Sequence, residues 1–417
     1  MLADEMGLGK TPQAIRAAEL IGAKKILVIC PACARVNWQR EFIKFADERR
    51  TYIASSKFSP KATHAARVII VSFDALVKCK ALREHILHLD RCVTVVDEAH
   101  YLKTHDSKRT KIVFGRNVNG DWPSLAHKSD HLWLLTGTPV PNNASELFAP
   151  MKGMGLLPPH TKRAAFIQHF CSGYQDAFGF KITGSKNLRQ LHALWRGTFL
   201  RRRKAEVLPD MPPITWGTVY VEGIEPAIPE MPLVETLSDD DLIAWLQANS
   251  NSVAGYRRLV GLAKVSGAVA HIHSILDDAA QKIVVFAYHT DVIEQLTAQL
   301  SDYGAVSFYG KTSQKKRQEA IDNFQNTNGC RVFVGQITAA GTAINLDASS
   351  RLLFVEQDWV PGNNAQAAMR VHRMTQKHPC LIEFATLAGS VDEDIATAVA
   401  RKTRDIIKIL GDDDDQS

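Results

Sequence analysis

The first segment with the residues for chemistry is a glycine-rich turn near the start of the chain, Asp4-Glu-Met-Gly7-Leu-Gly9-Lys10-Thr11, which precedes a helical pattern. Such a turn lets backbone N–H groups approach phosphate oxygens, and the N-terminus of the helix favours the anion. A lysine reaches the outer phosphates, and a Ser or Thr hydroxyl ligates Mg²⁺. The strict phosphate-loop pattern has glycine where this chain has Asp4. We predict that Gly7, Gly9, Lys10 and Thr11 bind a nucleotide.

A carboxylate pair follows the apolar run Val93 to Val96, where the chain reads Asp97-Glu98-Ala-His. At the end of a strand, one carboxylate can hold hydrated Mg²⁺ while its neighbour polarises the attacking water. An isolated Asp-Glu pair is more often part of a solvated loop. Downstream of a phosphate-binding turn, the pair predicts a nucleoside triphosphatase in which Thr11 and Asp97 hold the metal through water.

A third polar segment, Leu135-Thr136-Gly137-Thr138-Pro139, ends another strand pattern. Hydroxyl groups beside the carboxylates could sense the terminal phosphate and pass that state onward, so Thr136 and Thr138 are candidate coupling residues. The alternative is an ordinary turn at the end of a strand.

The second half of the chain carries two arginines, Arg370 and Arg373, spaced to lie on one face of a predicted helix. Such a pair can neutralise charge on a transferring phosphate, which contributes on the order of 10³ to 10⁵ in rate. A solvated basic helix face is the alternative. Gly341, which precedes them, would allow a ligand to approach the backbone closely.

Short β-branched runs alternate with helical periods along the chain, which predicts an α/β fold with parallel sheets flanked by helices. Strands are predicted at 25–30, 67–72, 92–97, 131–136, 283–288, 305–309, 331–335, 351–356 and 380–385. Helices are predicted at 12–21, 290–300, 313–325 and 391–410. The strand signal fades between residues 139 and 200, which predicts a mainly helical insertion, and prolines mark a connector from Pro209 to Pro232.

The length of 417 residues is too great for one ordinary core and favours two lobes. We predict an N-terminal lobe over 1–200 with a helical insertion near 140–200, a linker with a helical insertion over 201–265, a C-terminal lobe over 266–411 and an acidic tail over 412–417.

Composition excludes collagen, coiled coils and wholesale disorder, because 45% of residues are hydrophobic and 23% are charged. The apolar runs fall far short of the roughly 18 residues that indicate a membrane span, and no secretory leader is expected. The net charge of +6 includes four negative charges at Asp412 to Asp415, so the remaining chain is more basic. That balance is compatible with a polyanionic partner. Cys30 and Cys33 lack the further ligands of a zinc site.

The order of these motifs resembles the Swi/Snf-type ATPases of helicase superfamily two. The resemblance rests on the motifs above, on Asn142-Asn143-x-x-Glu-Leu-Phe, on Phe199-Leu-Arg-Arg-Arg-Lys204 and on Gln366-Ala-x-x-Arg-x-His-Arg-x-x-Gln. It covers nearly the whole chain. Phe286-Ala-Tyr-His289 is similar to the branch of annealing helicases and fork remodellers, and Glu356 stands where most relatives carry Asp.

The resemblance implies two RecA-like lobes that use ATP and Mg²⁺ to move along double-stranded or branched DNA. It makes Lys10, Asp97, Glu98, Arg370 and Arg373 catalytic and adds Gln366 and Gly341 to the nucleotide site. It also places DNA contacts at Pro31, Trp38, Ser72, Asn142, Asn143, Gly310, Lys311 and Thr338. Such contacts should mostly touch phosphates and sugars, so that binding depends on salt and little on base sequence. A core aromatic is the alternative for Trp38.

The chain departs from the family in two places. Only Met1-Leu-Ala precedes Asp4, where relatives carry an adenine-recognising glutamine motif, and Met374-Thr375 replaces Ile-Gly. Either the chain is truncated or other groups hold adenine. A strand-separating RNA or DNA helicase and a DNA-binding subunit with a decayed ATPase remain alternatives to a translocase. We expect a monomeric motor in the cytoplasm of a prokaryotic or phage-infected cell, or in the nucleus of a eukaryote.

Overall fold

The structure is a computed structural model that describes residues 1–115, 124–140, 142–176, 179–223, 250–277, 281–340, 344–387 and 392–393. These residues form two compact units, and the chain passes from the first to the second between Val207 and Leu208. The predicted helix at 391–410 and the acidic tail lie outside the described residues, apart from residues 392–393.

The first unit contains a five-stranded parallel sheet in the order β2-β3-β1-β4-β5. Its strands are β1 (Ile26–Cys30), β2 (Thr51–Ala54), β3 (Val68–Ser72), β4 (Arg91–Asp97) and β5 (Ser129–Leu135). The predicted strands are confirmed, and β2 is an additional short edge strand. The central strands β1 and β3 are buried along their whole length, which explains their uninterrupted β-branched sequences.

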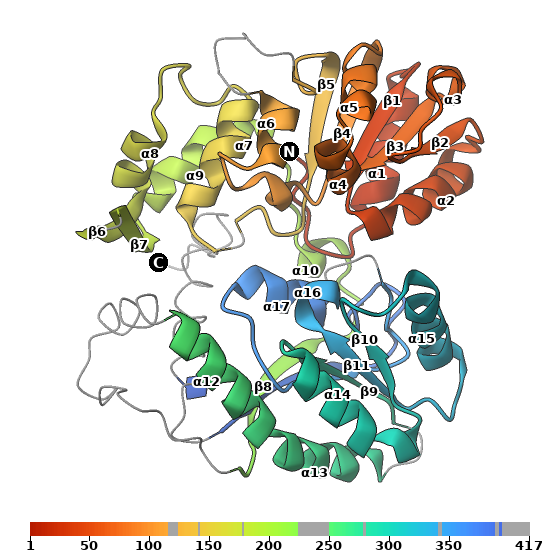
Figure 1. Ribbon diagram of the computed structural model, residues 1–417, viewed down its shortest axis with the longest axis vertical. Coiled ribbons are helices and arrows are strands. Elements are labelled where there is room, and N and C mark those ends of the chain that lie inside the picture. The colour runs from red at the N-terminus through yellow and green to blue at the C-terminus, as the bar shows by residue number, and fades with distance from the viewer. Residues whose placement is uncertain are drawn as a thin grey trace. The chain divides into compact units, whose positions relative to one another are not determined.

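Helices cover both faces of this sheet (Figure 1). One face packs against α1 (Lys10–Leu20) and α2 (Arg35–Ala46), which contribute Ile15, Trp38 and Phe42 to the core. The other face packs against α4 (Phe73–Lys78), α5 (Lys80–Leu87) and α6 (Lys108–Phe114). The short elements η1 (Ala32–Ala34), α3 (Pro60–Ala65) and η2 (Ala99–Leu102) complete this part.

The insertion after β5 is less helical than predicted. It contains η3 (Ala144–Leu147), α7 (Phe148–Gly153), α8 (Arg163–Phe170), α9 (Leu188–Trp195), η4 (Arg196–Thr198) and α10 (Lys204–Val207). However, β6 (Cys171–Asp176) and β7 (Gly179–Ser185) form an antiparallel hairpin. Gly173 permits the close approach of the two strands, since a Cβ atom there would lie 1.9 Å from the carbonyl oxygen of Lys181.

The second unit contains a six-stranded parallel sheet in the order β10-β11-β9-β12-β13-β8. Its strands are β8 (Ile214–Tyr220), β9 (Ile283–Ala287), β10 (Val306–Phe308), β11 (Val332–Gln336), β12 (Arg351–Phe354) and β13 (Cys380–Thr386). Its helices are α12 (Ser250–Ala263), α13 (Val265–Leu276), α14 (Thr290–Gln299), η6 (Ser301–Tyr303), α15 (Gln314–Asn326), α16 (Ile337–Ala340) and α17 (Pro361–Ala368).

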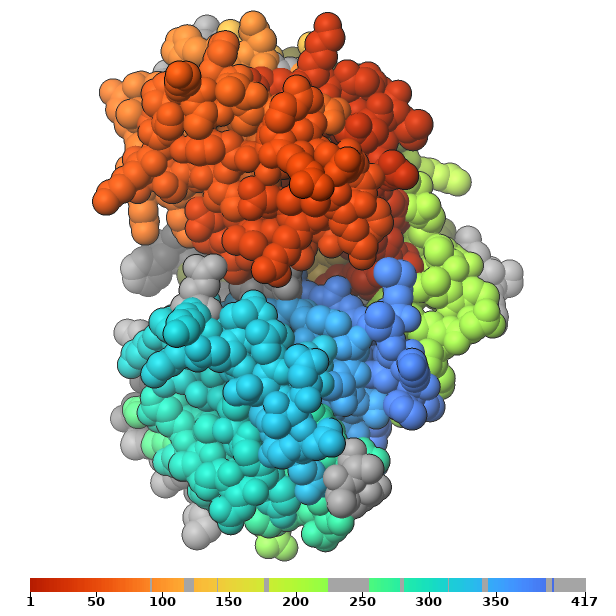
Figure 2. All heavy atoms as spheres, turned by 90° about the vertical axis from the view of Figure 1, so that its right-hand side faces the viewer, coloured from red at the N-terminus to blue at the C-terminus, as the bar shows by residue number. Residues whose placement is uncertain are grey.

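Strand β8 corrects the prediction of a connector between Pro209 and Pro232, because residues 214–220 belong to the second sheet. Trp216 stacks on Phe384, which stacks on Phe354, so an aromatic row fixes β8 against its neighbours. The strand lies at the sheet's edge, and its segment reaches the surface in Figure 2 (light green). Flanking prolines and the internal Gly217 concealed this strand in the sequence.

Among the described residues, no single helix is long and apolar enough to cross a membrane. Residues 255–263 of α12 and helix α13 reach that length only as a pair bent by 42°. The apolar side chains of α13, including Ala268, Ile272 and Leu276, pack in the core of the second unit.

Candidate functional site

The glycine-rich turn enters α1 through left-handed backbone at two positions. Gly7 has a φ of 92° and Gly9, the N-cap of α1, has a φ of 72°. Residues with side chains rarely adopt such angles, so both positions favour glycine. Lys10 is the first residue of the helix and Thr11 the second. A turn of this kind before a helix N-terminus provides backbone N–H groups for phosphate oxygens.

Lys10 is held by the turn that precedes it. Its Nζ atom donates hydrogen bonds to the carbonyl oxygens of Asp4 (2.7 Å) and Glu5 (3.1 Å). Loss of hydration lowers its pKa to about 8, and the negative charges of Glu98 and Asp97 partly oppose that change. The ammonium group therefore remains mostly charged at neutral pH, which suits it to bind a phosphate.

The carboxylate pair lies at the carboxyl end of β4. Asp97 Oδ2 accepts a hydrogen bond from Trp38 Nε1 (2.8 Å), and Asp97 Oδ1 accepts one from the backbone N–H of Glu98 (2.9 Å). Burial and the neighbouring charge of Glu98 raise the pKa of Asp97 to about 6. A nearby cation would favour its ionised form.

The oxygen groups present fit Mg²⁺ with most of its ligands drawn from water and phosphate. Thr11, Asp97 and Glu98 offer hydroxyl and carboxylate oxygens, which are the ligands that Mg²⁺ prefers. Within the described part of the chain, no three His, Cys, Asp or Glu side chains cluster as a metal site. The described residues therefore do not supply a complete set of protein ligands for a metal ion.

The Thr136 turn lies between the glycine-rich turn and the carboxylates. His100 Nδ1 is 3.3 Å from both Glu98 Oε2 and Thr136 Oγ1, and the Thr138 N–H donates to Thr136 Oγ1. A Cβ atom on Gly137 would lie 2.3 Å from Met6 Cγ and 3.4 Å from Lys10 Nζ. Thr136 and Thr138 are therefore joined to Glu98 through His100, whose role the sequence motif alone did not predict.

Strand pairing explains why the glycine-rich turn, Thr136 and Asp97 lie close together. Leu2 forms parallel bridges to Leu135 and to Leu200, so the start of the chain lies beside β5, which in turn pairs with β4. The carboxyl ends of neighbouring parallel strands meet at one edge of a sheet. The glycine-rich turn, Thr136 and Asp97 follow three adjacent strand segments and meet there.

The two arginines of the second unit do not lie within a helix, which corrects the prediction. Helix α17 ends at Ala368, and Arg370 and Arg373 occupy the turns that follow. The Arg370 carbonyl accepts a hydrogen bond from Leu346 N–H, and an Arg373 guanidinium N–H donates to the Ile344 carbonyl (3.0 Å). These contacts bind the segment after α17 to residues 344–346. Gln366 is buried in α17, and Gly341 lies outside the described residues.

At two of the positions predicted to contact DNA, the side chain is buried, so the prediction is corrected for these two side chains. Trp38 is 1% exposed and donates to Asp97, so its indole lies in the core beside the carboxylates. Ser72 is 3% exposed and its hydroxyl caps α4 by accepting from the N–H of Ala75. Neither side chain is accessible to DNA.

The other candidate DNA contacts in the first unit are half-exposed. Pro31 precedes η1 at the carboxyl end of β1. Asn143 Oδ1 accepts from the N–H of Ser145 and so caps η3, while the N–H of Asn142 donates to Glu146 Oε2. Glu146 also pairs with Lys103 Nζ at 2.8 Å, so this turn is fixed to the residue that follows η2.

In the second unit, Gly310, Lys311 and Thr338 lie near the carboxyl ends of the paired strands β10 and β11. Gln336 holds this edge together: its Oε1 atom accepts from Gly310 N–H (3.1 Å), and its Nε2 atom donates to the Tyr288 carbonyl (3.1 Å). Lys311 and Thr338 are exposed. This arrangement leaves both side chains accessible to a partner.

Glu356, which follows strand β12, belongs to the same hydrogen-bonded network, because it also binds Tyr288. Glu356 Oε2 accepts from the N–H groups of Tyr288 and His289, and Oε1 bonds His289 Nδ1 at 2.6 Å. A Cβ atom on Gly261 would lie 2.5 Å from Glu356 Oε1, so glycine makes room for the longer acid. The two branch markers of the sequence, His289 and Glu356, are thus direct partners.

A family model described as an SNF2-related domain matches residues 1–223, and one described as a helicase conserved C-terminal domain matches residues 267–375. The chain belongs to the SNF2-related family. Its two units are RecA-like lobes, each with a parallel sheet flanked by helices. The first match spans the glycine-rich turn, the carboxylates and the Thr136 turn, and the second spans Gly310 to Arg373.

Relatives of this SNF2-related chain include a SWI/SNF-related matrix-associated actin-dependent regulator of chromatin subfamily A-like protein 1 homolog from Caenorhabditis elegans. That protein is 30% identical over 96% of this chain and 58% of its own length. The DNA annealing helicase and endonuclease ZRANB3 of Homo sapiens is 26% identical over 94% of this chain and 37% of its own length. The chain therefore spans only part of the relatives that it matches.

A solved structure, the Sulfolobus solfataricus SWI2/SNF2 ATPase core in complex with dsDNA, is 21% identical to this chain. The match covers 98% of this chain and 92% of that one, with a TM-score of 0.43.

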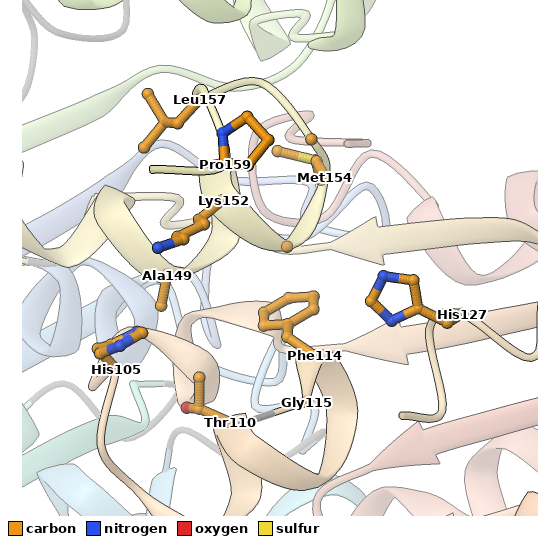
Figure 3. A pocket seen from close by; sticks show the side chains of 12 residues that line it. His105, Thr110, Phe114, Gly115, His127, Ala149, Lys152, Met154, Leu157 and Pro159 are labelled. Carbon is orange, nitrogen blue, oxygen red and sulfur yellow. The ribbon is translucent and has the colours of Figure 1, made fainter. Parts of the chain in front are cut away.

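The SNF2-related lobe also has a hollow of about 420 Å³ lined by residues of α6 and α7 (Figure 3). Its walls include His105, Phe114, His127 and Lys152. Lys152 Nζ donates to the Thr161 carbonyl and lies over the Phe148 ring. None of the predicted site residues lines this hollow, so it is separate from the glycine-rich turn.

Proposed function

We propose that the chain is a DNA-dependent ATPase that couples ATP hydrolysis to movement along double-stranded or branched DNA, working as a monomeric motor. The observation that supports this most is the meeting of Lys10, Asp97, Glu98 and the Thr136 turn at one sheet edge. Membership of the SNF2-related family and the DNA-related names of its relatives support the DNA dependence.

In this proposal, the backbone of Gly7 to Gly9 and the Lys10 ammonium bind the phosphates of ATP. Thr11 and Asp97 would hold Mg²⁺ through water, and the ion would supply positive charge to the phosphate oxygens when bound. Glu98 accepts a proton from the attacking water, and His100 links that carboxylate to Thr136. Arg370 and Arg373 supply positive charge to the transferring phosphate.

DNA would be bound mainly through its phosphates by the exposed groups of both units, including Lys311, Thr338, Asn142 and Asn143. Affinity should therefore fall steeply with salt concentration and depend little on base sequence. The paired carboxylates and the lysine disfavour the alternative of a DNA-binding subunit with a decayed ATPase, since those groups remain assembled.

The test is ATP turnover measured without DNA and with duplex, forked or single-stranded DNA of equal length. We expect stimulation by duplex or forked DNA and a loss of turnover in Lys10→Ala. Lys24→Ala, the same change at an exposed lysine of the same unit, serves as the control and should retain activity. Turnover that no DNA stimulates, or that survives in Lys10→Ala, would overturn the proposal.

Strand displacement on forked DNA and forked RNA, with annealing of complementary strands measured in parallel, separates a translocase from a strand-separating helicase. We expect little displacement of either duplex. Efficient unwinding, with RNA favoured, would replace the translocase by the strand-separating alternative.

A further inference from the structure

The segment that ends the first unit runs alongside the glycine-rich turn. The N–H of Ala3 donates to the Leu200 carbonyl (2.7 Å), and the N–H of Glu5 donates to the Arg202 carbonyl (3.0 Å). The Arg201 guanidinium donates a hydrogen bond to the Ala3 carbonyl (3.0 Å). Residues nearly 200 positions apart thus pair as neighbouring extended segments.

Asp4 is the centre of this contact. Its side chain is fully buried, and its Oδ1 atom accepts from the backbone N–H and the Nε of Arg202, both at 3.1 Å. Its Oδ2 atom accepts from the other side of the same guanidinium and from Gln13 Nε2 (3.1 Å). A buried carboxylate is tolerated only with such complete pairing. The residue that departs from the strict phosphate-loop pattern is therefore specifically bound.

Gln13 completes the hydrogen-bonded network around Asp4 and Arg202. Its Nε2 atom also donates to the Leu8 carbonyl (2.8 Å), and its Oε1 atom accepts from Arg202. The Arg202 guanidinium thereby holds both ends of the turn, Asp4 directly and Leu8 through Gln13.

Lys204 supports the middle of the turn. Its backbone N–H donates to Glu5 Oε2 (2.7 Å), and its side chain, 5% exposed, lies against Gly7. A Cβ atom on Gly7 would lie 3.2 Å from Lys204 Cε, which is tighter than ordinary contact.

These contacts reach the nucleotide site through the same backbone that holds Lys10. The carbonyls of Asp4 and Glu5 accept from Lys10 Nζ, and the Arg202 segment fixes both residues. Bidentate guanidinium–carboxylate pairs restrict orientation as well as distance, which a lysine in the same place would not do.

We propose that Arg202 is a positioning residue for the nucleotide-binding turn, which acts through Asp4 and Gln13 to hold the backbone around Lys10 in its phosphate-binding shape. The inference rests on the proposed ATPase function. Within the Phe199–Lys204 motif, it assigns Arg202 to the support of the nucleotide site.

The experiment compares Arg202→Gln with Arg203→Gln, which removes the same charge one residue away, where the arginine pairs with Glu206 at the surface. The affinity of the full chain for a fluorescent ATP analogue with Mg²⁺ and for duplex DNA is measured, together with the melting temperature. We expect Arg202→Gln to weaken nucleotide binding about tenfold or more, because charged hydrogen bonds are lost, with DNA affinity within about twofold. Arg203→Gln should bind the ATP analogue and duplex DNA with the affinities of the unchanged protein.

Nucleotide affinity in Arg202→Gln equal to that of the unchanged chain would overturn the inference and leave the ATPase proposal standing. Failure of the unchanged chain to bind nucleotide would instead overturn the ATPase proposal. Equal loss of nucleotide and DNA binding in a folded Arg202→Gln would show a general structural role and would also overturn the inference.

A double-mutant cycle keeps the test decisive if Arg202→Gln does not fold. Asp4→Asn and Arg202→Lys each preserve size and some hydrogen bonding. Because both changes act on one contact, their effects on nucleotide affinity should be less than additive. Additive effects, or no effect of either, would contradict the proposed route through Asp4.

Discussion

The carboxyl edges of the two parallel sheets hold several of the predicted site residues, but the two edges differ in their chemistry. At the first edge, loss of hydration lowers the pKa of Lys10 to about 8 and raises that of Asp97 to about 6. At the second edge, Gln336 and Glu356 are engaged in hydrogen bonds to backbone N–H and carbonyl groups and to His289.

This difference separates two tasks. Ionisable groups with shifted pKa values are suited to binding phosphate and moving a proton, and they are typical of catalytic sites. A hydrogen-bonded network fixes the positions of the groups around it. We infer that the first edge carries the chemistry and that the second holds its partner-binding turns in place.

The largest effect is expected from Arg370 and Arg373, which belong to the second unit but are proposed to take part in the chemistry. Arg370→Ala and Arg373→Ala should each reduce DNA-stimulated ATP turnover by about 10³ to 10⁵, because charge on the transferring phosphate is no longer neutralised. Nucleotide affinity should change far less. Arg258→Ala, at an exposed pair with Asp291, is the control. A loss below tenfold would remove both arginines from the chemistry.

Glu98→Gln tests the first edge. Without a general base, turnover should fall by about 10² to 10⁴ while ATP remains bound, measured by single-turnover hydrolysis and by nucleotide titration. Glu84→Gln changes an exposed carboxylate of α5 and should leave both unaffected. Loss of nucleotide affinity in Glu98→Gln with unchanged single-turnover rate would reverse the assignment.

The pKa of Lys10 gives a pH dependence for the first edge. The lowered pKa of about 8 means that the neutral form predominates above pH 8, so ATP affinity should fall by up to about tenfold per pH unit there. Below pH 7 the lysine is charged and its contribution is constant. Lys10→Arg keeps the charge, and its affinity should show a weaker decline between pH 8 and 9. An equal decline of ATP affinity with pH in the unchanged protein and in Lys10→Arg would contradict the lowered pKa of Lys10.

The smallest effect is expected at the second edge. Gln336→Leu removes the bonds to Gly310 and Tyr288 and should weaken DNA stimulation about threefold to tenfold, since the two bonds together contribute about 1 kcal/mol. ATP turnover without DNA should stay constant. Gln318→Leu, which breaks only a surface contact with Asp322, is the matched control. An equal fall in turnover with and without DNA would show that this edge also serves the chemistry.

Buried parallel strands were predictable because uninterrupted β-branched runs are typical of strands that helices cover on both faces. Strand β2 is only Thr51–Ala54, and β8 contains Gly217 between residues of alternating exposure, so neither shows such a run. The hairpin of β6 and β7 was hidden by glycines within a segment of scattered aromatics. The helix predicted through Arg373 ends at Ala368, and the N–H groups of Arg370 and Val371 then bond to carbonyls three residues back in a tighter turn.

The sequence by itself determined which reactive groups the chain carries and in what order, because the glycine-rich turn, the carboxylate pair and the Thr136 turn are each contiguous in the chain. Only the tertiary structure decided that Trp38 faces Asp97 rather than a partner, that His100 joins Glu98 to Thr136, and that Arg202 binds Asp4. Parallel strand pairing brings these distant residues to one edge, and the loss of hydration there sets the pKa values on which their chemistry depends.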